Sequence, residues 1–214
     1  MSLKLNEIFF SIQGESLYSG IPCVFIRLAG CNLRCTYCDT AYAWDDGIYM
    51  DVKEIVDRIK KFHCRLVEIT GGEPLIQDET PSLIDTLIDS GYTVLLETNG
   101  SIDIRKVSSE CIKIMDIKCP SSNESGKNRL ENIRYLGKKD QIKFVIGCRE
   151  DYLFARNIFQ EYCMNITNGN ILFSVNSTSL SPHELAAWIL EDSLNVRFHL
   201  QLHKIIWPEI ERGV

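Results

Sequence analysis

The run Pro22-Cys23-Val24-Phe25-Ile26-Arg27-Leu28 leads into Cys31-Asn32-Leu33-Arg34-Cys35-Thr36-Tyr37-Cys38, and together the two stretches say most about this chain. The first reads as a buried strand. Cysteine thiolates are the usual ligands of iron–sulfur clusters, and ferredoxins normally supply four of them. Three cysteines so close together therefore predict a cluster that keeps one iron open for chemistry, at the carboxyl end of a strand, where proteins built of βα units place active sites.

Further apolar runs along the chain predict a parallel sheet. Several are continuously apolar rather than alternating, which is typical of strands covered on both faces. The expected strands span residues 22–28, 66–70, 92–97, 112–117, 141–146, 170–175 and 196–201.

Helical periodicity fills several of the gaps between these strands. Apolar residues recur at helical spacing over 52–62 and over 83–88, and the second pattern stops at Gly91. Ser181-Pro182-His183-Glu184 predicts a third helix, because serine with a glutamate three residues later forms a capping box and proline suits the first helical position. The residues expected to face inward from this helix are Leu185, Trp188 and Ile189.

Strands that alternate with helices indicate an α/β fold with right-handed crossovers, either an open sheet or a barrel. A complete eight-unit barrel usually needs about 250 residues, and this chain has 214. The connection 98–111 is also too short for a long helix. We therefore expect one domain, residues 1–214, folded as a partial (βα)6-type TIM barrel with compressed helices.

Composition narrows the classes of partner. Apolar residues make up 45% of the chain, enough for one core, and the formal net charge of −6 disfavours binding nucleic acid by bulk electrostatics. No window approaches the ~18 apolar residues of a membrane span, and no secretory signal is visible. We expect a cytoplasmic protein without a membrane or nucleic-acid partner, whose six other cysteines are reduced, mostly buried apolar residues.

A second motif, Thr70-Gly71-Gly72-Glu73-Pro74, directly follows the expected strand 66–70. Two glycines let the backbone approach a ligand closely, and exposed backbone groups can meet an ammonium or a carboxylate. Alone the motif is weak, because glycine and proline also mark ordinary turns. The cysteines likewise have an alternative as a zinc site, although zinc prefers four closed ligands and neither a second CxxC nor a His pair at finger spacing is present.

Together the two motifs resemble those of the radical S-adenosylmethionine (SAM) superfamily, whose CxxxCxxC signature has an aromatic residue before its last cysteine, as Tyr37 is here. The resemblance implies a [4Fe-4S] cluster on Cys31, Cys35 and Cys38, with SAM bound to the open iron and its amino group near Gly72. In that superfamily reductive cleavage of SAM gives a radical that abstracts hydrogen. The protein orients the reactants and excludes water.

Four further stretches narrow the resemblance: Phe10-Ser11-Ile12-Gln13-Gly14-Glu15-Ser16, Phe25-Ile26-Arg27-Leu28, Cys38-Asp39-Thr40, and the ending Gln201-Leu202-His203-Lys204 with Arg212-Gly213-Val214. Nearly end to end, the chain resembles the 7-carboxy-7-deazaguanine synthase family of queuosine and 7-deazapurine biosynthesis. The resemblance implies a lyase that converts 6-carboxy-5,6,7,8-tetrahydropterin to 7-carboxy-7-deazaguanine and releases ammonia. It also implies Mg²⁺, a homodimer and an external electron donor such as flavodoxin.

The same resemblance assigns site residues. Arg27 would face the substrate carboxylate, a task suited to a planar fork of donors, and the Thr40 hydroxyl would bind Mg²⁺, a hard ion that takes oxygen ligands. Without the family, Arg27 reads as half of a salt bridge and Thr40 as a turn residue. The other substrate contacts would be Ile12, Gln13, Gly14, Thr70 and Val214, the last at the end of a tail that closes the substrate pocket.

Cofactor contacts implied by the resemblance lie on three loops and one strand end. They are Tyr37, Cys38, Asp39, Gly72, Cys119, Pro120, Ser121, Phe173, Ser174, Val175 and Asn176. Glu15, Glu97 and His203 are candidates to contact the pterin or to move protons, each with a scaffold role as its alternative.

Two other functions explain part of the pattern. A glycyl-radical-enzyme activase also carries CxxxCxxC and would act on a protein backbone, but such activases lack the stretch 11–15 and the ending 201–204. A redox carrier or a zinc-stabilised binding module would explain the cysteines and leave the GGEP motif unexplained.

Overall fold

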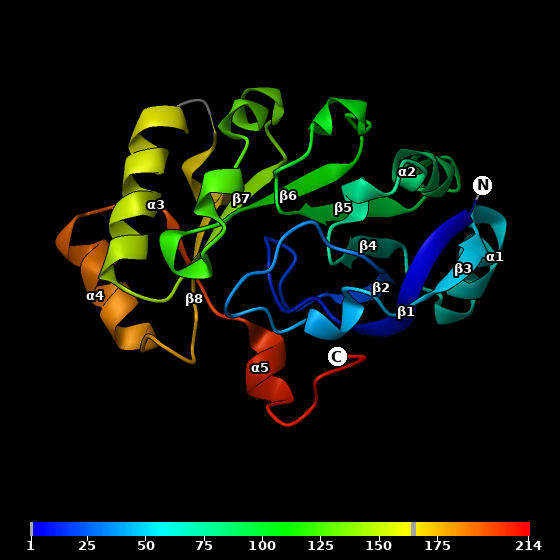
Figure 1. Ribbon diagram of the computed structural model, residues 1–214, viewed down its shortest axis with the longest axis horizontal. Coiled ribbons are helices and arrows are strands. Elements are labelled where there is room, and N and C mark those ends of the chain that lie inside the picture. The colour runs from blue at the N-terminus through cyan, green and yellow to red at the C-terminus, as the bar shows by residue number, and fades with distance from the viewer. Residues whose placement is uncertain (1, 164–165) are drawn as a thin grey trace.

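The computed structural model describes residues 2–163 and 166–214. Within these ranges the strands form one nine-stranded sheet in the order β3-β1-β2-β4-β5-β6-β7-β8-β9 (Figure 1). All neighbours from β2 to β9 pair in parallel, whereas β1 pairs antiparallel with β2 and with β3. The sheet does not close on itself, so the expected partial α/β barrel is confirmed.

The strands are β1 Ser2–Ile12, β2 Pro22–Leu28, β3 Ile48–Asp51, β4 Leu66–Gly71, β5 Thr93–Thr98, β6 Ile112–Ile117, β7 Gln141–Ile146, β8 Ile171–Val175 and β9 Arg197–His199. The α-helices are α1 Val52–Ile59, α2 Thr80–Asp89, α3 Arg149–Tyr162, α4 Pro182–Glu191 and α5 Leu202–Ile206. None of the helices in these described ranges is long and apolar enough to cross a membrane.

The two strands at one side of the sheet, β1 and the edge strand β3, were not expected from the sequence. Strand β1 is only half buried: Leu3 and Leu5 pack in the core beneath the helices, with exposed or half-buried polar residues beside them, and Phe9 packs in the smaller core on the other face. It therefore carries the period-two signal of a strand with one solvated face rather than the continuous apolar run of a parallel strand. Strand β9 also ends earlier than expected, at His199 rather than at 201.

The expected helices form close to their predicted positions. Helix α1 continues into a 3-10 turn, Lys60–Phe62, and α4 begins with the predicted capping box between Ser181 and Glu184. Only 3-10 turns fill the connections β5–β6 and β6–β7, as the short 98–111 segment led us to expect. Helix α3 was not expected, since its apolar face is interrupted by charged residues.

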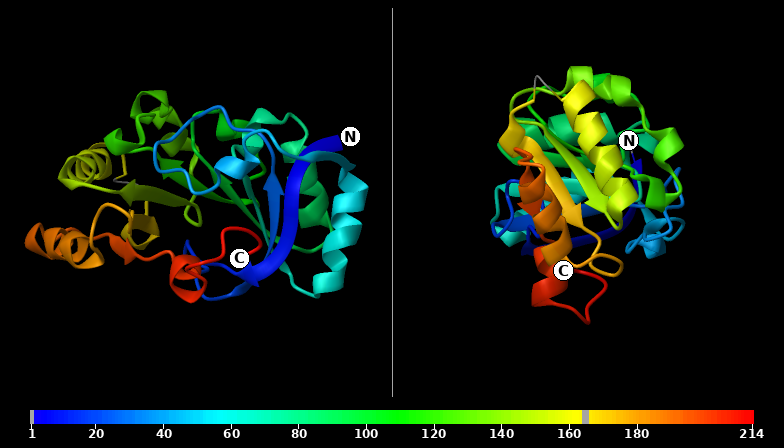
Figure 2. Two further views of the ribbon diagram at one scale, coloured as in Figure 1. Left: turned by 60° about the horizontal axis from the view of Figure 1, so that its bottom comes forward. Right: turned by 90° about the vertical axis from the view of Figure 1, so that its left-hand side faces the viewer.

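Alternation along the parallel strands separates two environments. Outward residues pack beneath the helices in two cores, one against α1 and α2 and the other against α3 and α4. Inward residues are apolar near the strand starts, where Phe9, Cys23, Phe25, Leu95 and Ile114 form a third, smaller core. Nearer the strand ends the inward residues become polar. Figure 2 shows the C-terminal segment with α5 lying between β1 and β9, away from the layer formed by α1 and α2.

Candidate active site

The cysteine triplet lies in the loop that follows β2. Cys31, Cys35 and Cys38 are free and partly exposed, whereas Cys23 at the start of the same strand is fully buried. The loop begins at Gly30, whose φ of +95° is in the region that favours glycine. This places three accessible thiols together at the carboxyl end of a barrel strand, as the sequence predicted.

Backbone contacts hold this cysteine loop from two sides. Thr36 donates its amide to Ser122 O at 3.1 Å and its hydroxyl to Ser121 O at 2.6 Å. The Arg34 amide donates to Glu124 Oε1 at 2.7 Å, from the same turn after β6. On the opposite side, the Asn32 side chain donates to Ser101 Oγ at 2.9 Å. These hydrogen bonds fix the conformation of the cysteine loop.

Burial disfavours the ionised form of two of these three thiols. Burial raises the pKa of Cys31, although the Leu33 amide, which donates to its Sγ at 3.4 Å, partly opposes the rise. Burial also raises the pKa of Cys35 to about 11, although the nearby charge of Lys118 acts in the opposite direction. Among the described residues, no three His, Cys, Asp or Glu side chains converge to hold one metal ion. Thiolates that each bind a separate iron of a cluster need not converge in that way. The donor set fits an iron–sulfur cluster.

The two glycines of the GGEP motif pack directly on the cysteine loop. A Cβ at Gly72 would lie 2.2 Å from Gly30 O and 2.7 Å from Cys31 Cβ, and a Cβ at Gly71 would lie 2.2 Å from Leu28 O. The Glu73 amide donates to Gly30 O at 2.8 Å. Glycine is thus required here by close approach of two backbones.

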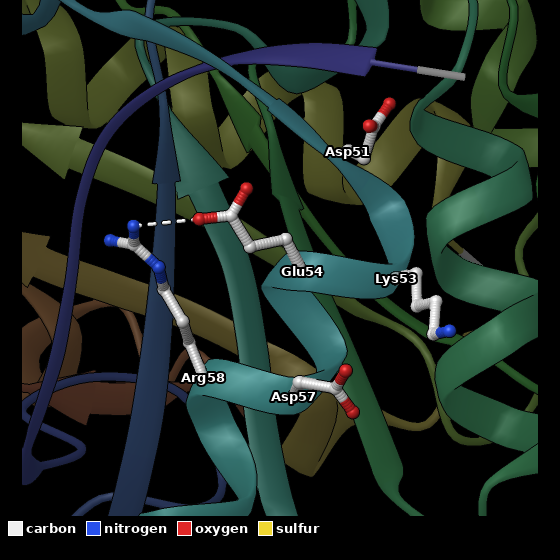
Figure 3. Close-up of a pocket in the computed structure, with 5 residues that line it drawn as sticks. All are labelled: Asp51, Lys53, Glu54, Asp57 and Arg58. Atoms are coloured by element: carbon white, nitrogen blue, oxygen red, sulfur yellow. Dashed lines mark hydrogen bonds and ion pairs between the residues drawn. The ribbon is translucent and has the colours of Figure 1, made fainter.

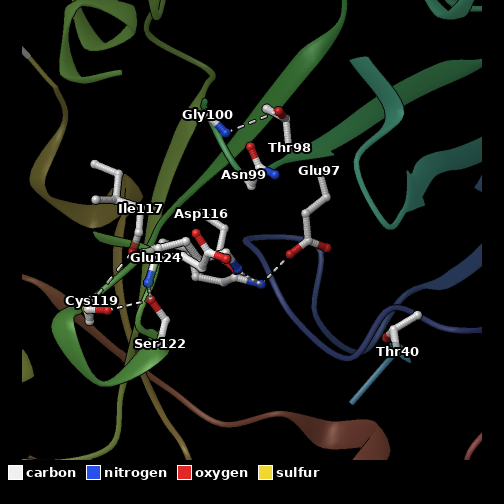
Figure 4. A network of polar contacts seen from close by, with 12 residues as sticks. Thr40, Glu97, Thr98, Asn99, Gly100, Asp116, Ile117, Cys119, Ser122 and Glu124 are labelled. Carbon is white, nitrogen blue, oxygen red and sulfur yellow. Dashed lines mark hydrogen bonds and ion pairs between the residues drawn. The ribbon is translucent and has the colours of Figure 1, made fainter. Parts of the chain in front are cut away.

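The Glu73 carboxylate is a structural tie between strand ends. It is fully buried and accepts from Leu75 N at 3.0 Å, Thr98 Oγ1 at 2.8 Å and Asn99 N at 2.6 Å. Burial raises its pKa, and these three donors oppose the rise. Figure 4 shows Thr98, Asn99 and Gly100 at the end of β5. Both carboxylate oxygens are occupied, so the motif offers backbone groups to a ligand.

Further into the barrel, Lys143 of β7 gathers three carboxylates. Its Nζ lies 2.8 Å from Glu15 Oε2 and 3.5 Å from Asp116 Oδ2, and it also pairs with Glu97. Glu97 and Asp116 come from β5 and β6, and Figure 4 shows both side chains in this polar network. Burial lowers the pKa of the ammonium, but the carboxylates outweigh burial and hold the pKa well above its usual value. The structure therefore brings together two of the three candidate catalytic residues, Glu15 and Glu97.

The loop after β1 carries the predicted substrate contacts and meets the C-terminal segment. The Gln13 amide donates to Glu68, and its oxygen accepts from Glu15 N at 2.5 Å, so both ends of that side chain are engaged. Gly14 O accepts from Leu202 N at 2.9 Å, and a Cβ at Gly14 would lie 2.4 Å from His203 Nδ1. This contact brings His203 beside the loop that carries Glu15.

Arg27 and Thr70 are direct neighbours in the sheet, paired between β2 and β4. Arg27 donates from Nε to Glu7 Oε1 at 2.8 Å, and Tyr42 donates its hydroxyl to the same oxygen at 2.9 Å. The scaffold salt bridge expected as the alternative for Arg27 is thus present, and it leaves the outer guanidinium nitrogens for other partners. Arg212 of the tail lies 4.2 Å from the Tyr42 ring centre, so the C-terminus reaches this cluster.

Thr40 and Asp39 follow the last cysteine. The Thr40 hydroxyl donates to Asp39 Oδ1 at 3.0 Å, and Lys204 Nζ lies 2.7 Å from Asp39 Oδ2. Desolvation by neighbouring atoms opposes ionisation of Asp39, whose side chain is half exposed, but the Lys204 ammonium outweighs it and lowers the pKa of that carboxyl. Oxygen atoms from residues 39 and 40 therefore lie together beside the cysteine loop.

The other predicted cofactor contacts fall into two groups. Ser121 faces the cysteine loop through its carbonyl, and Asp151 accepts from its amide at 2.8 Å and from its hydroxyl. The Cys119 thiol is fully buried in the outer core, as are the Phe173 and Val175 side chains, the former against Phe144 and Tyr152. A cofactor contact from these three residues would therefore have to come from their backbone groups.

Several polar residues of the inner face were missed in the sequence: Glu68, Asp116, Lys118, Gln141, Lys143 and His199. Among the described residues, buried atoms without a hydrogen-bond partner include Asp116 Oδ1, Gln141 Nε2, Ser174 Oγ and His199 Nδ1, which lie on four successive strands. The signal that could have found them is a polar residue inside an otherwise apolar strand, because buried polar groups need a partner.

A surface depression on α1 lies apart from this site. Asp51, Lys53, Glu54, Asp57 and Arg58 line it, and Figure 3 shows Arg58 paired with Glu54. The two ions are 2.7 Å apart and half exposed, as is usual for a solvated helix face. We assign no function to this depression.

Comparisons with known proteins agree with the site. The family model of the Radical SAM superfamily matches residues 25–116 of this chain. The chain is 42% identical over 226 residues to the 7-carboxy-7-deazaguanine synthase of Koribacter versatilis (strain Ellin345), covering 99% of this chain and 100% of the relative. It is 41% identical over 215 residues to the enzyme of that name from Chlorobaculum tepidum, covering 99% and 97%.

A solved structure has the same fold. The crystal structure of QueE from Escherichia coli superposes with a TM-score of 0.79 at 22% identity, covering 94% of each chain. The full-length identities above, together with this fold, place the chain in the 7-carboxy-7-deazaguanine synthase family of the radical SAM superfamily.

Proposed function

We propose that the chain is a carbon–nitrogen lyase that converts 6-carboxy-5,6,7,8-tetrahydropterin to 7-carboxy-7-deazaguanine and releases ammonia. The observation that supports this most is the position of two carboxylates, Glu15 and Glu97, on one buried ammonium, inside a barrel whose rim carries three accessible thiols. A site of this kind combines radical generation with groups that move protons. The family relationship supplies the identity of the substrate and product.

Cys31, Cys35 and Cys38 would hold the [4Fe-4S] cluster that the superfamily implies, and backbone groups at Gly72 would receive SAM. When bound, the cluster and SAM supply the radical that abstracts hydrogen from the substrate. Tyr37, Asp39, Ser121 and the segment 173–176 complete the proposed cofactor contacts. The chain's own task is to fix the cysteine loop, which it does through Thr36, and to exclude water.

Substrate would lie on the inner face between β1, β2 and β4. The free nitrogens of Arg27 suit a carboxylate, and Thr70 lies beside Arg27 in the sheet. Ile12, Gln13 and Gly14 would border the ring system from the loop after β1. Val214, close to Arg212 in the tail, would complete the pocket from the C-terminal side.

Thr40 would give Mg²⁺ one protein ligand, since this ion keeps several waters and binds substrate oxygens. Its hydroxyl already lies against Asp39, so negative charge is available next to it. Glu15 and Glu97 would accept or return protons at the pterin ring, and His203, packed on Gly14, would act from the opposite side.

We also propose that the single domain works in the cytoplasm as a homodimer. Exposed Ile205, Ile206 and Ile210 on the C-terminal segment are candidates for covered positions in such a dimer. Electrons would come from an external donor such as flavodoxin. The exposed Arg34 in the cysteine loop offers a positive charge for an acidic carrier.

Anaerobically reconstituted protein tests the proposal. With dithionite, SAM, Mg²⁺ and the carboxytetrahydropterin, we expect ammonia and 7-carboxy-7-deazaguanine in equal amounts by mass spectrometry and enzymatic ammonia assay. Omitting SAM should abolish both. An intact cluster without product, or a glycyl radical formed on an added protein, would replace this function by another radical SAM activity. About one zinc and no iron would remove the radical function altogether.

A further inference from the structure

Lys143 is an unusual residue for the inside of a barrel. Its side chain is 4% exposed, and it meets carboxylates from three separate parts of the chain: the loop after β1, the end of β5, and β6. Lysine is seldom buried unless it is paired, because removing an ammonium from water costs several kcal/mol. The three carboxylates around Lys143 therefore stabilise its buried ammonium.

The groups around Lys143 carry an excess of negative charge. Glu15, Glu97 and Asp116 contact it, and Glu68 of β4 lies near enough to feel its charge. Lys118 pairs with Asp116 at 2.9 Å. The other titratable groups near this cluster are His199 of β9, His203 of α5, and Asp39 and Tyr37 of the cysteine loop. Four carboxyl groups and two ammonium groups share the space. Without the Lys143 ammonium, carboxylates so close together cannot all stay ionised.

Glu15 depends on Lys143 most directly. One carboxylate oxygen lies 2.8 Å from Nζ and the other accepts from Gln201 Nε2 at 2.9 Å, so both are fixed. Burial would raise the pKa of Glu15, but Lys143 and His203 outweigh burial and hold the pKa well below its usual value. Glu97 shares the same ammonium from the neighbouring side.

We propose that Lys143 is the positioning residue of this active site, which keeps Glu15 ionised and aims both Glu15 and Glu97 at the substrate. This inference rests on the proposed function, because it assigns Lys143 a task in the same reaction. A lysine that only stabilised the fold would lower stability when removed and leave the pH dependence of kcat/KM unchanged. The two roles therefore predict different results.

The chain offers a matched control in Lys113 of β6. Its side chain is 5% exposed and lies 3.7 Å from Asp140 Oδ2, near the start of the strand rather than its end. It also donates to Ser108 O and Cys111 O, both at 3.2 Å. Lys113 is thus an equally buried, paired lysine of the same sheet, but it lies on the outward side with Met115 and Ile117 and has no contact with Glu15 or Glu97.

The experiment compares Lys143→Met, Lys143→Arg and Lys113→Met for the pH dependence of kcat/KM. If ionised Glu15 is needed, activity falls as pH drops through its pKa. We expect Lys143→Met to move that acid limb upward by at least about one pH unit and to lower kcat/KM by about 10²-fold at pH 7. Lys143→Arg should keep the acid limb of the wild type. Lys113→Met should lower the Tm and leave the limb in place.

A second readout is independent of turnover. In cluster-free protein with ¹³C-labelled glutamate carboxyls, we expect the Glu15 resonance, assigned with Glu15→Gln, to titrate at higher pH in Lys143→Met than in the wild type. If Lys143→Met is insoluble, Lys143→Gln takes its place in both measurements. An unmoved acid limb with an unmoved Glu15 titration overturns the role of Lys143. Wild-type protein that makes no deazaguanine overturns the proposed function instead. In that case the titration of Glu15 still tests whether Lys143 controls the protonation of Glu15.

Discussion

Gly72 and Cys31 pack so closely that a Cβ at Gly72 would lie 2.7 Å from the Cβ of Cys31, although they follow different strands of the barrel. The carbonyl of Gly30 would be closer still, at 2.2 Å. Backbone cannot yield as a flexible side chain can, so any side chain at position 72 must displace the cysteine loop. The shape of the loop that carries the thiols therefore depends on the GGEP motif.

We predict that Gly72→Ala lowers both stability and iron content. Overpacking costs about 1–3 kcal/mol, and for a domain of this size each kcal/mol lowers the Tm by about 2–4 °C. Iron and sulfide per chain after anaerobic reconstitution, measured beside the Tm, check the prediction. Gly126→Ala is the control, because a Cβ there would meet nothing within 4 Å. Equal iron content in Gly72→Ala and the wild type would show that the loop does not need this packing.

Thr40→Ala should raise the Mg²⁺ concentration needed for half-maximal turnover, because the proposed oxygen ligand is lost. The free energy of unfolding should change by no more than the ~0.5 kcal/mol typical of a surface substitution, so the Tm should stay close to that of the wild type. Thr40→Ser keeps the hydroxyl and should behave like the wild type. A magnesium titration of the three proteins decides the matter, and identical curves for alanine and wild type would remove Thr40 from the metal site.

Arg27→Met should weaken binding of the carboxylated pterin. Losing a charged hydrogen-bond partner costs about 1.5–3 kcal/mol, which corresponds to an increase of about 10- to 100-fold in KM. Arg27→Lys keeps the charge without the planar fork and should lie in between. Arg58→Met, on the solvated face of α1, should leave KM unchanged. A KM for Arg27→Met within twofold of the control would contradict the assignment.

Glu68→Gln should stabilise the protein at neutral and alkaline pH. Burial, together with Glu97 and Glu15, raises the pKa of Glu68 well above 4.5. A carboxyl with a raised pKa stabilises the fold fully below its unfolded pKa, and this contribution is lost as pH rises through the folded pKa. The glutamine resembles the protonated form at every pH, so its advantage should grow from pH 5 to pH 8, to about 1 kcal/mol or more.

Thermal unfolding of Glu68→Gln across that pH range gives the measurement. The control is Glu131→Gln, whose side chain is 66% exposed and whose Tm should follow the wild type at each pH. A constant Tm difference between Glu68→Gln and wild type would show that Glu68 is ionised throughout.

Local signals let the sequence locate the rim of the site. The cysteine loop and the GGEP motif are each short, local stretches of sequence, and each directly follows a mostly apolar strand. Their meeting at one end of a barrel could therefore be expected. Strand β1 escaped because its alternation, with Leu3 and Leu5 buried beneath the helices and polar residues beside them, differs from the pattern of the parallel strands. The antiparallel pairing of β1 depends on tertiary packing against neighbouring strands, which a local sequence pattern does not determine.

The interior of the site was largely beyond reach. Glu15 and Lys143 are 128 residues apart, and nothing near either residue names the other as its partner. Glu97 was singled out at a strand end, whereas Glu68 and Lys143 were not, although each is a charge inside an apolar strand. Their meeting depends on strand register, which becomes known only when the sheet is built.

A single-turnover reaction asks most directly whether this barrel rearranges a pterin. Reduced, reconstituted protein is mixed anaerobically with SAM, Mg²⁺ and 6-carboxy-5,6,7,8-tetrahydropterin, and 5′-deoxyadenosine, ammonia and 7-carboxy-7-deazaguanine are followed by mass spectrometry and ammonia assay. We predict that the deazaguanine and ammonia appear together in the wild type and that both are absent from a Cys38→Ala variant. Cleavage of SAM in the wild type with the pterin left intact would contradict the function proposed for this chain.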